Sequence, residues 1–167
     1  MKEQVVVANP YNEEHIYLLE KYEAKNNLTH TTTQYLKNTK KLMSEIDYRQ
    51  LEQETPEIVK TLFLQENGNI ITVLHLIGEK DRKICRMTID NTSNFKHQEK
   101  LLEEAENYAF TTLGMEEIII LQEKSRSIPS NYFKNRSFED LGMESNMQVY
   151  MKSRSSEIKD NQTNYQI

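Results

Sequence analysis

The side chains with the clearest chemical potential lie in one polar segment, from Asn91 to Glu99, between an expected strand and an expected helix. The segment follows a strand-like run, Ile84 to Asp90, and precedes an amphipathic run from about Lys100 to Leu113. A strand that leads into a helix N-terminus is the layout of many nucleotide and cofactor sites, because free N–H groups of the first helical turn bind phosphate. Lys96 and His97 add side-chain donors there.

Glycine is absent from this segment. Glycine normally lets a backbone wrap closely around a phosphate, and larger side chains tend to stand between the backbone N–H groups and the anion. We therefore expect phosphate binding to be weakened here but not excluded. The competing interpretation of His97 is an ordinary solvent-exposed loop histidine.

Other candidate groups are scattered. No metal site is predicted, because no histidine has metal-ligand spacing with Cys, Asp or Glu; the four are His15, His30, His75 and His97. His75 falls in an expected strand and is interpreted as a satisfied sheet residue rather than a base. Asp90 ends a central strand, where a carboxylate could act as a base or hold an amine. Carboxylates there are also common as loop starters and helix caps, and we favour that interpretation.

The composition indicates one globular domain and argues against nucleic acid and membranes as partners. The chain has 167 residues, 37% hydrophobic and 28% charged. Its formal charge of −5 argues against a general nucleic-acid binder, and a single cysteine allows no intrachain disulfide. No apolar run approaches the ~18–20 residues that span a bilayer, so we expect a cytoplasmic protein that does not enter membranes. Apolar residues thin out near Ser153, which predicts a domain over residues 1–153 and a mobile tail over 154–167.

Hydrophobic periodicity predicts the elements that position these groups. Asn67-Gly68, between two β-rich runs, is a strong hairpin signal, and the aliphatic run from Glu117 to Gln122 indicates a strand buried on both faces, as parallel pairing requires. The predicted order is β-α-α-β-β-β-α-β-α-β-β. Its other members are a strand over residues 4–8, a helix that Asn12 caps, a helix over 33–51, strands at 58–65 and 69–77, a helix at 128–136, and two last strands around Gly142.

Two motifs near the C-terminus carry a family resemblance. Gly114 to Leu121 (GMEEIIIL) is followed by Asn131 to Gly142 (NYFKNRSFEDLG), which looks like the ending "FYEKLGFEELG", with Phe138-Glu139 as its "FE". With the order of elements over about Gln4 to Ser153, the chain resembles the GNAT-type N-acyltransferase family. The resemblance implies a mixed α/β (α+β) fold with a mostly antiparallel sheet and one parallel strand pair.

The resemblance also implies a reaction. Members of the family transfer an acyl group from an acyl-CoA to an amine. For this chain, the resemblance implies transfer from acetyl-CoA or another acyl-CoA to an unknown acceptor. Pantetheine would lie where the strand from Ile84 to Asp90 and its parallel neighbour splay apart, and the pyrophosphate would lie on the following loop and helix N-terminus. The residues so assigned to the cofactor are Met87, Thr88, Ile89, Phe95, Lys96, His97 and Gln98.

The chain departs from the family pattern at two places. The phosphate loop, placed on Asn94 to Glu99, lacks the family's Arg/Gln-x-x-Gly-x-Gly/Ala motif. In the family, a tyrosine often protonates the leaving thiolate, but the matching position here is Phe133, which has no proton to give. Tyr132 beside it is the candidate catalytic acid. The alternative is that these aromatic residues only pack the helix onto the sheet. A second hypothesis for the whole chain is a catalytically inactive protein of this fold that binds a small molecule or a partner protein.

Overall fold

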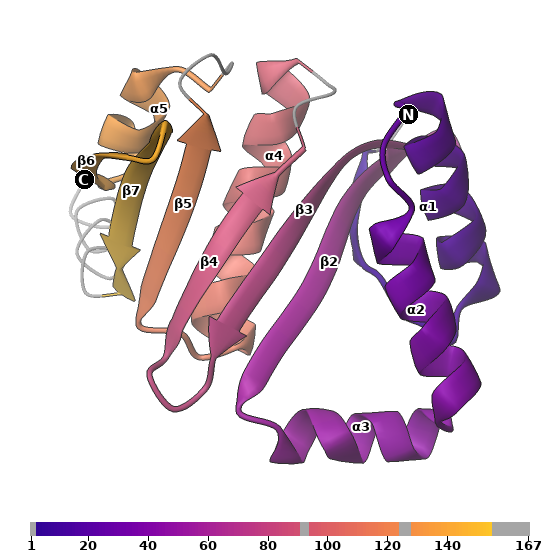
Figure 1. Ribbon diagram of the computed structural model, residues 1–167. Coiled ribbons are helices and arrows are strands. Elements are labelled where there is room, and N and C mark those ends of the chain that lie inside the picture. Colours follow the sequence, from indigo (N-terminus) through magenta and orange to yellow (C-terminus); the bar gives the residue numbers. More distant parts are fainter. Residues whose placement is uncertain (1–2, 91–93, 124–127, 155–167) are drawn as a thin grey trace, which may run out of the picture.

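The structure, a computed structural model, describes residues 3–90, 94–123 and 128–154. In this part of the chain, seven strands form one sheet in the order β1-β2-β3-β4-β5-β7-β6 (Figure 1). The elements are β1 (Gln4–Val7), α1 (Glu13–Lys25), α2 (Thr31–Leu42), α3 (Glu45–Glu54), β2 (Glu57–Glu66), β3 (Asn69–Glu79), β4 (Ile84–Ile89), α4 (Phe95–Asn107), a π-helical turn (Tyr108–Thr112), β5 (Glu117–Glu123), α5 (Ser130–Asn135), β6 (Glu139–Glu144) and β7 (Met147–Ser153).

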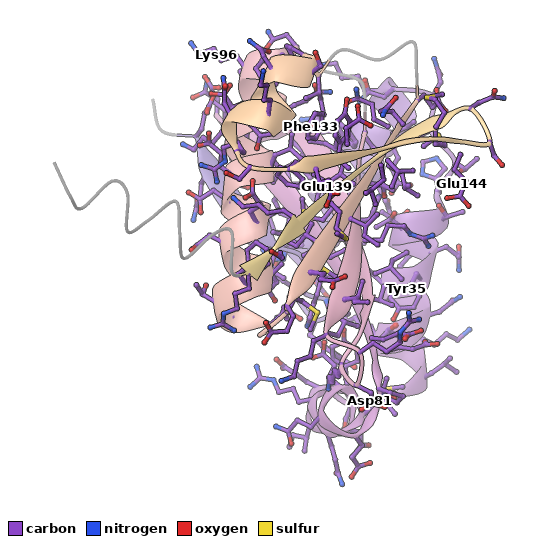
Figure 2. The ribbon with its side chains drawn as sticks, turned by 90° about the vertical axis from the view of Figure 1, so that its left-hand side faces the viewer. Tyr35, Asp81, Lys96, Phe133, Glu139 and Glu144 are labelled. Atoms are coloured by element: carbon purple, nitrogen blue, oxygen red, sulfur yellow. The ribbon has the colours of Figure 1, made fainter. Side chains whose placement is uncertain are left out.

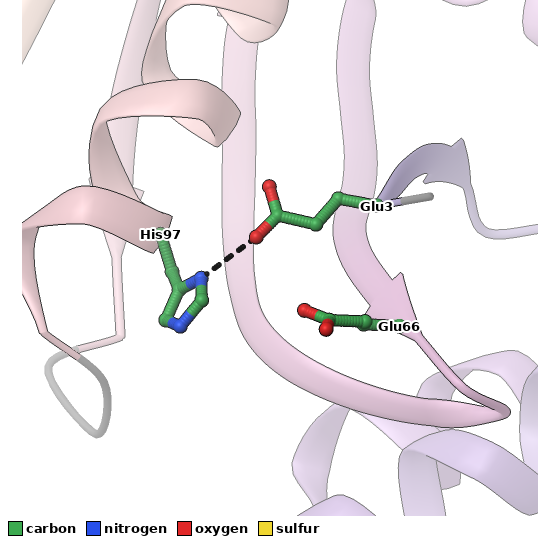
Figure 3. A group of neighbouring side chains, drawn as sticks. All are labelled: Glu3, Glu66 and His97. Atoms are coloured by element: carbon green, nitrogen blue, oxygen red, sulfur yellow. Dashed lines mark hydrogen bonds and ion pairs between the residues drawn. The ribbon is translucent and has the colours of Figure 1, made fainter. Parts of the chain in front are cut away.

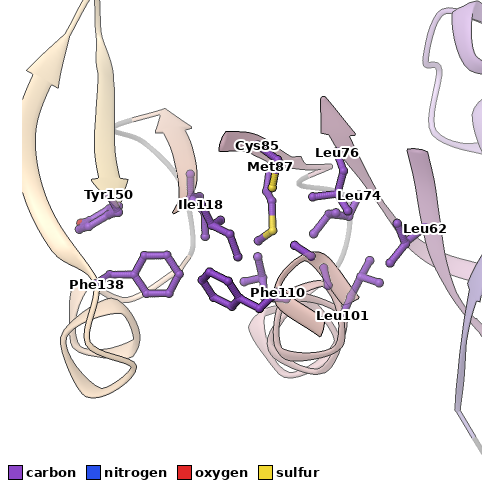
Figure 4. Close-up of a cluster of buried hydrophobic side chains, with 14 of the residues drawn as sticks. Leu62, Leu74, Leu76, Cys85, Met87, Leu101, Phe110, Ile118, Phe138 and Tyr150 are labelled. Carbon is purple, nitrogen blue, oxygen red and sulfur yellow. The ribbon is translucent and has the colours of Figure 1, made fainter. Parts of the chain in front are cut away.

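The sheet is antiparallel except for the pair β4 and β5, as predicted. Helices cover both faces. On one face, α4 and α5 pack on the larger core, in which Leu74, Met87 and Ile118 meet Leu101 and Phe110 (Figure 4). On the other face, α1 and α2 enclose a smaller core of Ile16, Leu19, Tyr22, Leu36, Phe63 and Val73. The central strands therefore bury side chains on both sides.

Local sequence signals explain several of these elements. The β2–β3 hairpin turns at Asn67 and Gly68, whose φ angles of 56° and 75° are those of the tight turn that Asn-Gly favours. The side chain of Asn12 accepts hydrogen bonds from the N–H groups of Glu14 and His15 and so caps α1. Both predictions are confirmed.

The helix predicted over residues 33–51 is wrong as one piece. It is two helices, α2 and α3, because Met43 adopts an extended conformation with φ −150° and ψ 158°. Ser44 then caps α3, and its side chain accepts a hydrogen bond from the N–H of Asp47 at 3.2 Å. A serine three positions before an acidic residue is a helix-start signal. The apolar periodicity over residues 33–51 favoured a single long helix in spite of that signal.

The loop assigned to Asn94 to Glu99 is also wrong in its local structure. Residues from Phe95 onward form the first turns of α4, about five positions before the predicted start at Lys100. The cause is Asn94, whose side chain accepts a hydrogen bond from the N–H of His97 at 3.4 Å and caps the helix. Lys96, His97 and Gln98 are thus helical residues.

The end of the sheet differs from the prediction in one detail. Gly142, with φ 88°, lies inside β6 at a register shift against β7 rather than between the two strands. The chain turns instead at Ser145 and Asn146, which both have positive φ. Of the segment predicted as a mobile tail, Arg154 is described, and its N–H donates to the carbonyl of Glu116 at 2.8 Å; residues 155–167 lie outside the described part. Among the described helices, none has the length and apolar character to cross a bilayer.

Candidate active site between β4 and β5

The parallel strands β4 and β5 part at their C-terminal ends. They pair from Ile84 with Glu117 to Met87 with Ile120, and no further. Beyond that point β4 stays paired with β3 as far as Ile89, while β5 stays paired with β7 as far as Glu123. In Figure 1 the two arrows diverge toward their tips. The sheet is therefore open between two strands whose outer partners hold them in place.

The opening exposes backbone polar groups. Alternate residues of a strand present their N–H and C=O groups to opposite neighbours. The N–H of Asp90 donates to the carbonyl of Val73 on β3 at 2.9 Å. The backbone groups of Ile89 therefore point the other way, toward β5, which at this level is too far away to pair with β4. An extended chain with amide groups fits such a place, because it can supply the hydrogen bonds of the missing strand.

A cavity of about 370 Å³ occupies this opening. Thr88, Ile89 and Asp90 line it from the side of β4, and Ile120, Leu121, Gln122 and Glu123 line it from the side of β5. Met87, the third strand residue assigned to the cofactor, lies fully buried in the larger core instead. The assigned strand residues are thus divided between the cavity wall and the core beneath it.

The N-terminus of α4 lies next to the opening. Gln98 is buried, and its Nε2 donates to the carbonyl of Asp90 at 3.3 Å, which ties the helix to the end of β4. The ring of Phe95 packs edge-on against Tyr132, with centroids 5.7 Å apart. Lys96 is exposed at the start of the helix, where Figure 2 labels it. Of Phe95, Lys96 and Gln98, only Lys96 has a side chain available to an anion at the helix N-terminus.

His97 lies on the side of α4 that faces away from the opening between β4 and β5. Its Nδ1 lies 3.0 Å from Oε1 of Glu3, just before β1, and Glu66 at the end of β2 lies beside them (Figure 3). These three groups could hold a cation, yet the Lys100 ammonium already lies 3.8 Å from Glu3 Oε2. The group is thus an ion-pair cluster that anchors the N-terminal strand to α4. It places His97 away from the cavity between β4 and β5.

Tyr132 lies in the interior and does not line the cavity. Its hydroxyl donates to Oε2 of Glu106 on α4 at 3.4 Å. Glu106 also accepts from Lys152 Nζ at 2.9 Å and from Arg136 at 3.3 Å. Burial raises the pKa of the Tyr132 hydroxyl, and the charge of Glu106 raises it further. The catalytic role of Tyr132 remains a prediction for which this geometry offers no support.

A second, smaller cavity of about 110 Å³ lies on the α1 side of the sheet. Asp90 and Leu28 line both cavities, so the smaller one adjoins the opening between β4 and β5. Glu23, on α1, lines the smaller cavity although it is only 4% exposed, and burial raises the pKa of its carboxyl. His75 on β3 lines it as well.

His75 and Asp90 form an electrostatic pair at the junction of the two cavities. Burial lowers the pKa of His75 from its usual value, and the negative charge of Asp90 opposes that shift. His75 stands directly opposite Thr88 in the β3–β4 pairing, and the Tyr22 hydroxyl donates to Asp90 Oδ2 at 3.4 Å. A neutral imidazole next to a carboxylate at the end of an open strand is a suitable proton acceptor.

Sequence comparisons find no match for this chain among family models or curated proteins. Solved structures match it in fold. The spermidine/spermine N-acetyltransferase SpeG from Vibrio cholerae, solved in mutant forms, is 12% identical with a TM-score of 0.65 over 95% of this chain and 99% of that one. A GNAT-family acetyltransferase from Streptococcus pneumoniae is 16% identical with a TM-score of 0.59 over 91% and 99%. N-acetyltransferase PseH from Campylobacter jejuni, in complex with acetyl coenzyme A, is 14% identical with a TM-score of 0.53 over 90% and 99%.

The chain has the GNAT fold. The strand order, the single parallel pair and the near-complete coverage agree with it, and identity at this level is too low to carry an activity or an acceptor. The absence of a sequence match accords with a divergent member of that fold.

Glu23, which lines the smaller cavity with Asp90 and His75, is the one of these three that sequence reasoning passed over. Glu23 lies seven positions after Ile16, on the apolar stripe of α1, and a carboxylate in such a stripe is itself a signal. For Asp90, the helix-cap part of the favoured interpretation is wrong, because Asn94 caps α4, whereas a place at the start of the loop agrees with β4 ending at Ile89. His75 has the hydrogen-bonding contact expected of a sheet residue, 3.3 Å from its Nδ1 to Oγ1 of Thr61, but it also faces the cavity.

Proposed function

We propose that this protein is an acyl-CoA-dependent N-acyltransferase. The observation that carries the proposal is the opening of β4 from β5 beyond Met87, with a cavity in it that adjoins an acidic cavity across the sheet. A linear thioester substrate and an amine can then approach each other from the two sides of Asp90. The GNAT fold of the neighbours supports this reaction class.

The proposed reaction is a direct transfer. The lone pair of a neutral amine attacks the thioester carbonyl carbon, a C–N bond forms, the C–S bond breaks, and the coenzyme leaves as a thiolate. One proton leaves the amine and one joins the thiolate, so the products are an amide and a free thiol. The chain must therefore accept a proton on the amine side.

His75 is our choice for the proton acceptor. Its lowered pKa keeps the imidazole neutral at neutral pH, and the carboxylate of Asp90 stabilises the imidazolium that proton transfer creates. Both groups line the cavity on the amine side. Asp90 acts here by positioning and charge, held by the Tyr22 hydroxyl at 3.4 Å.

The acyl-CoA would be held by backbone groups and by few side chains. Ile89 offers its backbone groups to an extended amide chain, and Thr88, Leu121 and Gln122 supply the walls. Among the described residues, Lys96 and the N-terminus of α4 are the remaining donors for the pyrophosphate, since Asn94 already takes one N–H of the first turn. We expect weaker anion binding than a glycine loop would give.

Calorimetric titration with acetyl-CoA tests the proposal. Leu121→Trp places a bulky ring in the opening and should abolish binding, while Leu141→Trp, on the exposed edge strand β6, should leave it unchanged. Lys96→Ala should weaken binding, because it removes a charge beside the pyrophosphate position. Binding that survives Leu121→Trp at full strength would place the ligand elsewhere.

The acceptor is not carried over from the neighbours. SpeG is a spermidine/spermine N-acetyltransferase, but its identity of 12% with this chain supports a shared fold and not a shared acceptor. The acceptor must therefore be inferred from this chain's own cavity.

A further inference from the structure

The smaller cavity contains a buried carboxylate that no described residue meets at full hydrogen-bond geometry, although the hydroxyl and the N–H of Thr33 lie near enough to favour its charged form. Glu23 is 4% exposed, and neither of its carboxylate oxygens receives a hydrogen bond within the described ranges 3–90, 94–123 and 128–154. Thr33 lies close by, but its hydroxyl donates to the carbonyl of His30 at 3.2 Å. A basic group, Nδ1 of His30, lies 3.9 Å away on a side chain that is 57% exposed.

Such a carboxylate is costly unless a cation joins it. A buried charge without hydrogen bonds loses its hydration, and a native chain keeps one there when a partner compensates the loss. Burial accordingly raises the pKa of Glu23; Thr33 and His30 oppose that shift in part, and the charge of Asp90 adds to it. The cavity that Glu23 lines is the natural place for that partner, and a positive charge there would compensate the carboxylate.

The cavity has one carboxylate inside and another at its mouth. Glu23 lines only the smaller cavity, whereas Asp90 lines both and lies at the end of β4 where acyl transfer is proposed. The walls include three apolar side chains, Leu19, Leu28 and Val73, together with polar side chains from Tyr22, His75 and the threonines at 29, 31 and 32. A ligand that matches this arrangement is cationic at one end, aliphatic in the middle and amino at the other end.

We propose that the acceptor is a short aliphatic diamine. Its distal amino group binds Glu23 as an ammonium, and its proximal amino group lies beside Asp90 and His75 and is acylated. This inference rests on the proposed acyl transfer for its chemistry, but the binding of the diamine does not. The volume of about 110 Å³ corresponds to about four water molecules, which suits a linker of three or four methylene groups.

The test compares 1,4-diaminobutane with 1-aminobutane, which has the same carbon chain and one amino group fewer. Thermal unfolding of the full chain is followed with each amine, without any acyl-CoA. The diamine should raise Tm further than the monoamine, because only the diamine can place an ammonium at Glu23 and a second amino group beside Asp90 at the same time. Equal shifts, or no shift from either amine, would overturn the inference.

Glu23→Gln provides the decisive variant. Glutamine has nearly the same size and no charge, so the fold should persist, which urea unfolding verifies. The affinity for the diamine should fall about 10- to 100-fold, and the diamine should then bind no better than the monoamine. Glu14→Gln, at an exposed position on the same helix, is the matched control and should change neither.

Acetyl-CoA titration separates failure of this inference from failure of the proposed function. If acetyl-CoA binds and the diamine preference is absent or survives Glu23→Gln, the diamine site is wrong and the transferase proposal stands. If the diamine binds through Glu23 and acetyl-CoA does not bind, the transferase proposal fails and the site is a diamine-binding site.

Discussion

Two buried glutamates of this fold have opposite environments. Glu106 on α4 is 1% exposed and is surrounded by Lys152, Arg136 and the Tyr132 hydroxyl. Glu23 on α1 is nearly as buried, yet neither of its oxygens receives a hydrogen bond from a described residue, and it lines a cavity. Burial raises the pKa of both carboxyls, but only for Glu106 do neighbouring ammonium and guanidinium groups oppose the shift.

The difference distinguishes a structural group from a candidate binding group. Around Glu106 the chain supplies the charges that the carboxylate needs, and the network joins α4, α5 and β7 behind the sheet. At Glu23 the compensating charge is left to a ligand. The same residue type therefore serves stability in one core and recognition next to the other.

The largest expected effect comes from breaking the complete network. Lys152→Met leaves Glu106 as a buried carboxylate with its closest cation removed, and we expect the free energy of unfolding to fall by about 3–5 kcal/mol. Urea unfolding measures it. Lys134→Met, on the exposed face of α5, is the control and should change little. The double variant Glu106→Gln/Lys152→Met should recover much of the loss; if it does not, the destabilisation comes from packing.

Removing the proposed proton acceptor should affect rate more than stability. His75→Gln keeps a polar side chain of similar reach, and we expect kcat to fall about 100-fold. The rate of the unaltered enzyme should decline as the pH falls through the lowered pKa of His75, which lies below the usual histidine value, since protonated His75 cannot accept a proton. A pH profile that His75→Gln leaves unchanged would remove His75 from the mechanism.

The unpaired glutamate should leave a smaller, pH-dependent mark on stability. Because the pKa of Glu23 is raised on folding, the folded state binds more protons than the unfolded state at pH values from the usual 4.5 up to the raised value. The contribution of Glu23 to stability thus falls as the pH rises through that window. Glu23→Gln should abolish it, so the stability of the variant relative to the original chain should increase with pH. A pH-independent difference would contradict a raised pKa.

Tyr132→Phe should have the smallest effect. It removes one hydrogen bond to a carboxylate that keeps two cationic partners, so we expect a loss of about 0.5–1.5 kcal/mol in unfolding free energy. The kcat of Tyr132→Phe tests the predicted role of Tyr132 as the catalytic acid. A preserved kcat means that it is structural, and a large drop in kcat with little change in stability would establish it as catalytic.

The sequence predicts those parts of the fold whose signals are local. Asn67-Gly68 specifies a hairpin, and the aliphatic run of β5 indicates its parallel, doubly buried position. Asn94 likewise signals the start of α4, but the comparison with a glycine-rich phosphate loop favours a loop where the chain is already helical. Element types are therefore more predictable than element boundaries.

The site is less predictable because it depends on contacts between distant segments. His97 faces Glu3, which lies 94 positions earlier, so nothing around His97 in the sequence indicates its direction. Glu23 joins Asp90 at one cavity only because α1 packs on β3, the neighbour of the strand that ends before Asp90. Thr88 and Ile89 can be assigned to the opening from the family resemblance, but not from their own residue types.

The central claim is that the opening between β4 and β5 transfers an acyl group to an amine, and thiol release measures this directly. The purified protein is mixed with acetyl-CoA and 1,4-diaminobutane, and free coenzyme A thiol is followed over time. The chain's own cysteine, Cys85, is buried, with a thiol pKa raised to about 12, so it should stay silent in this assay. We predict release of thiol that requires both protein and amine and that Leu121→Trp abolishes. Acetyl-CoA binding without amine-dependent thiol release would contradict the account.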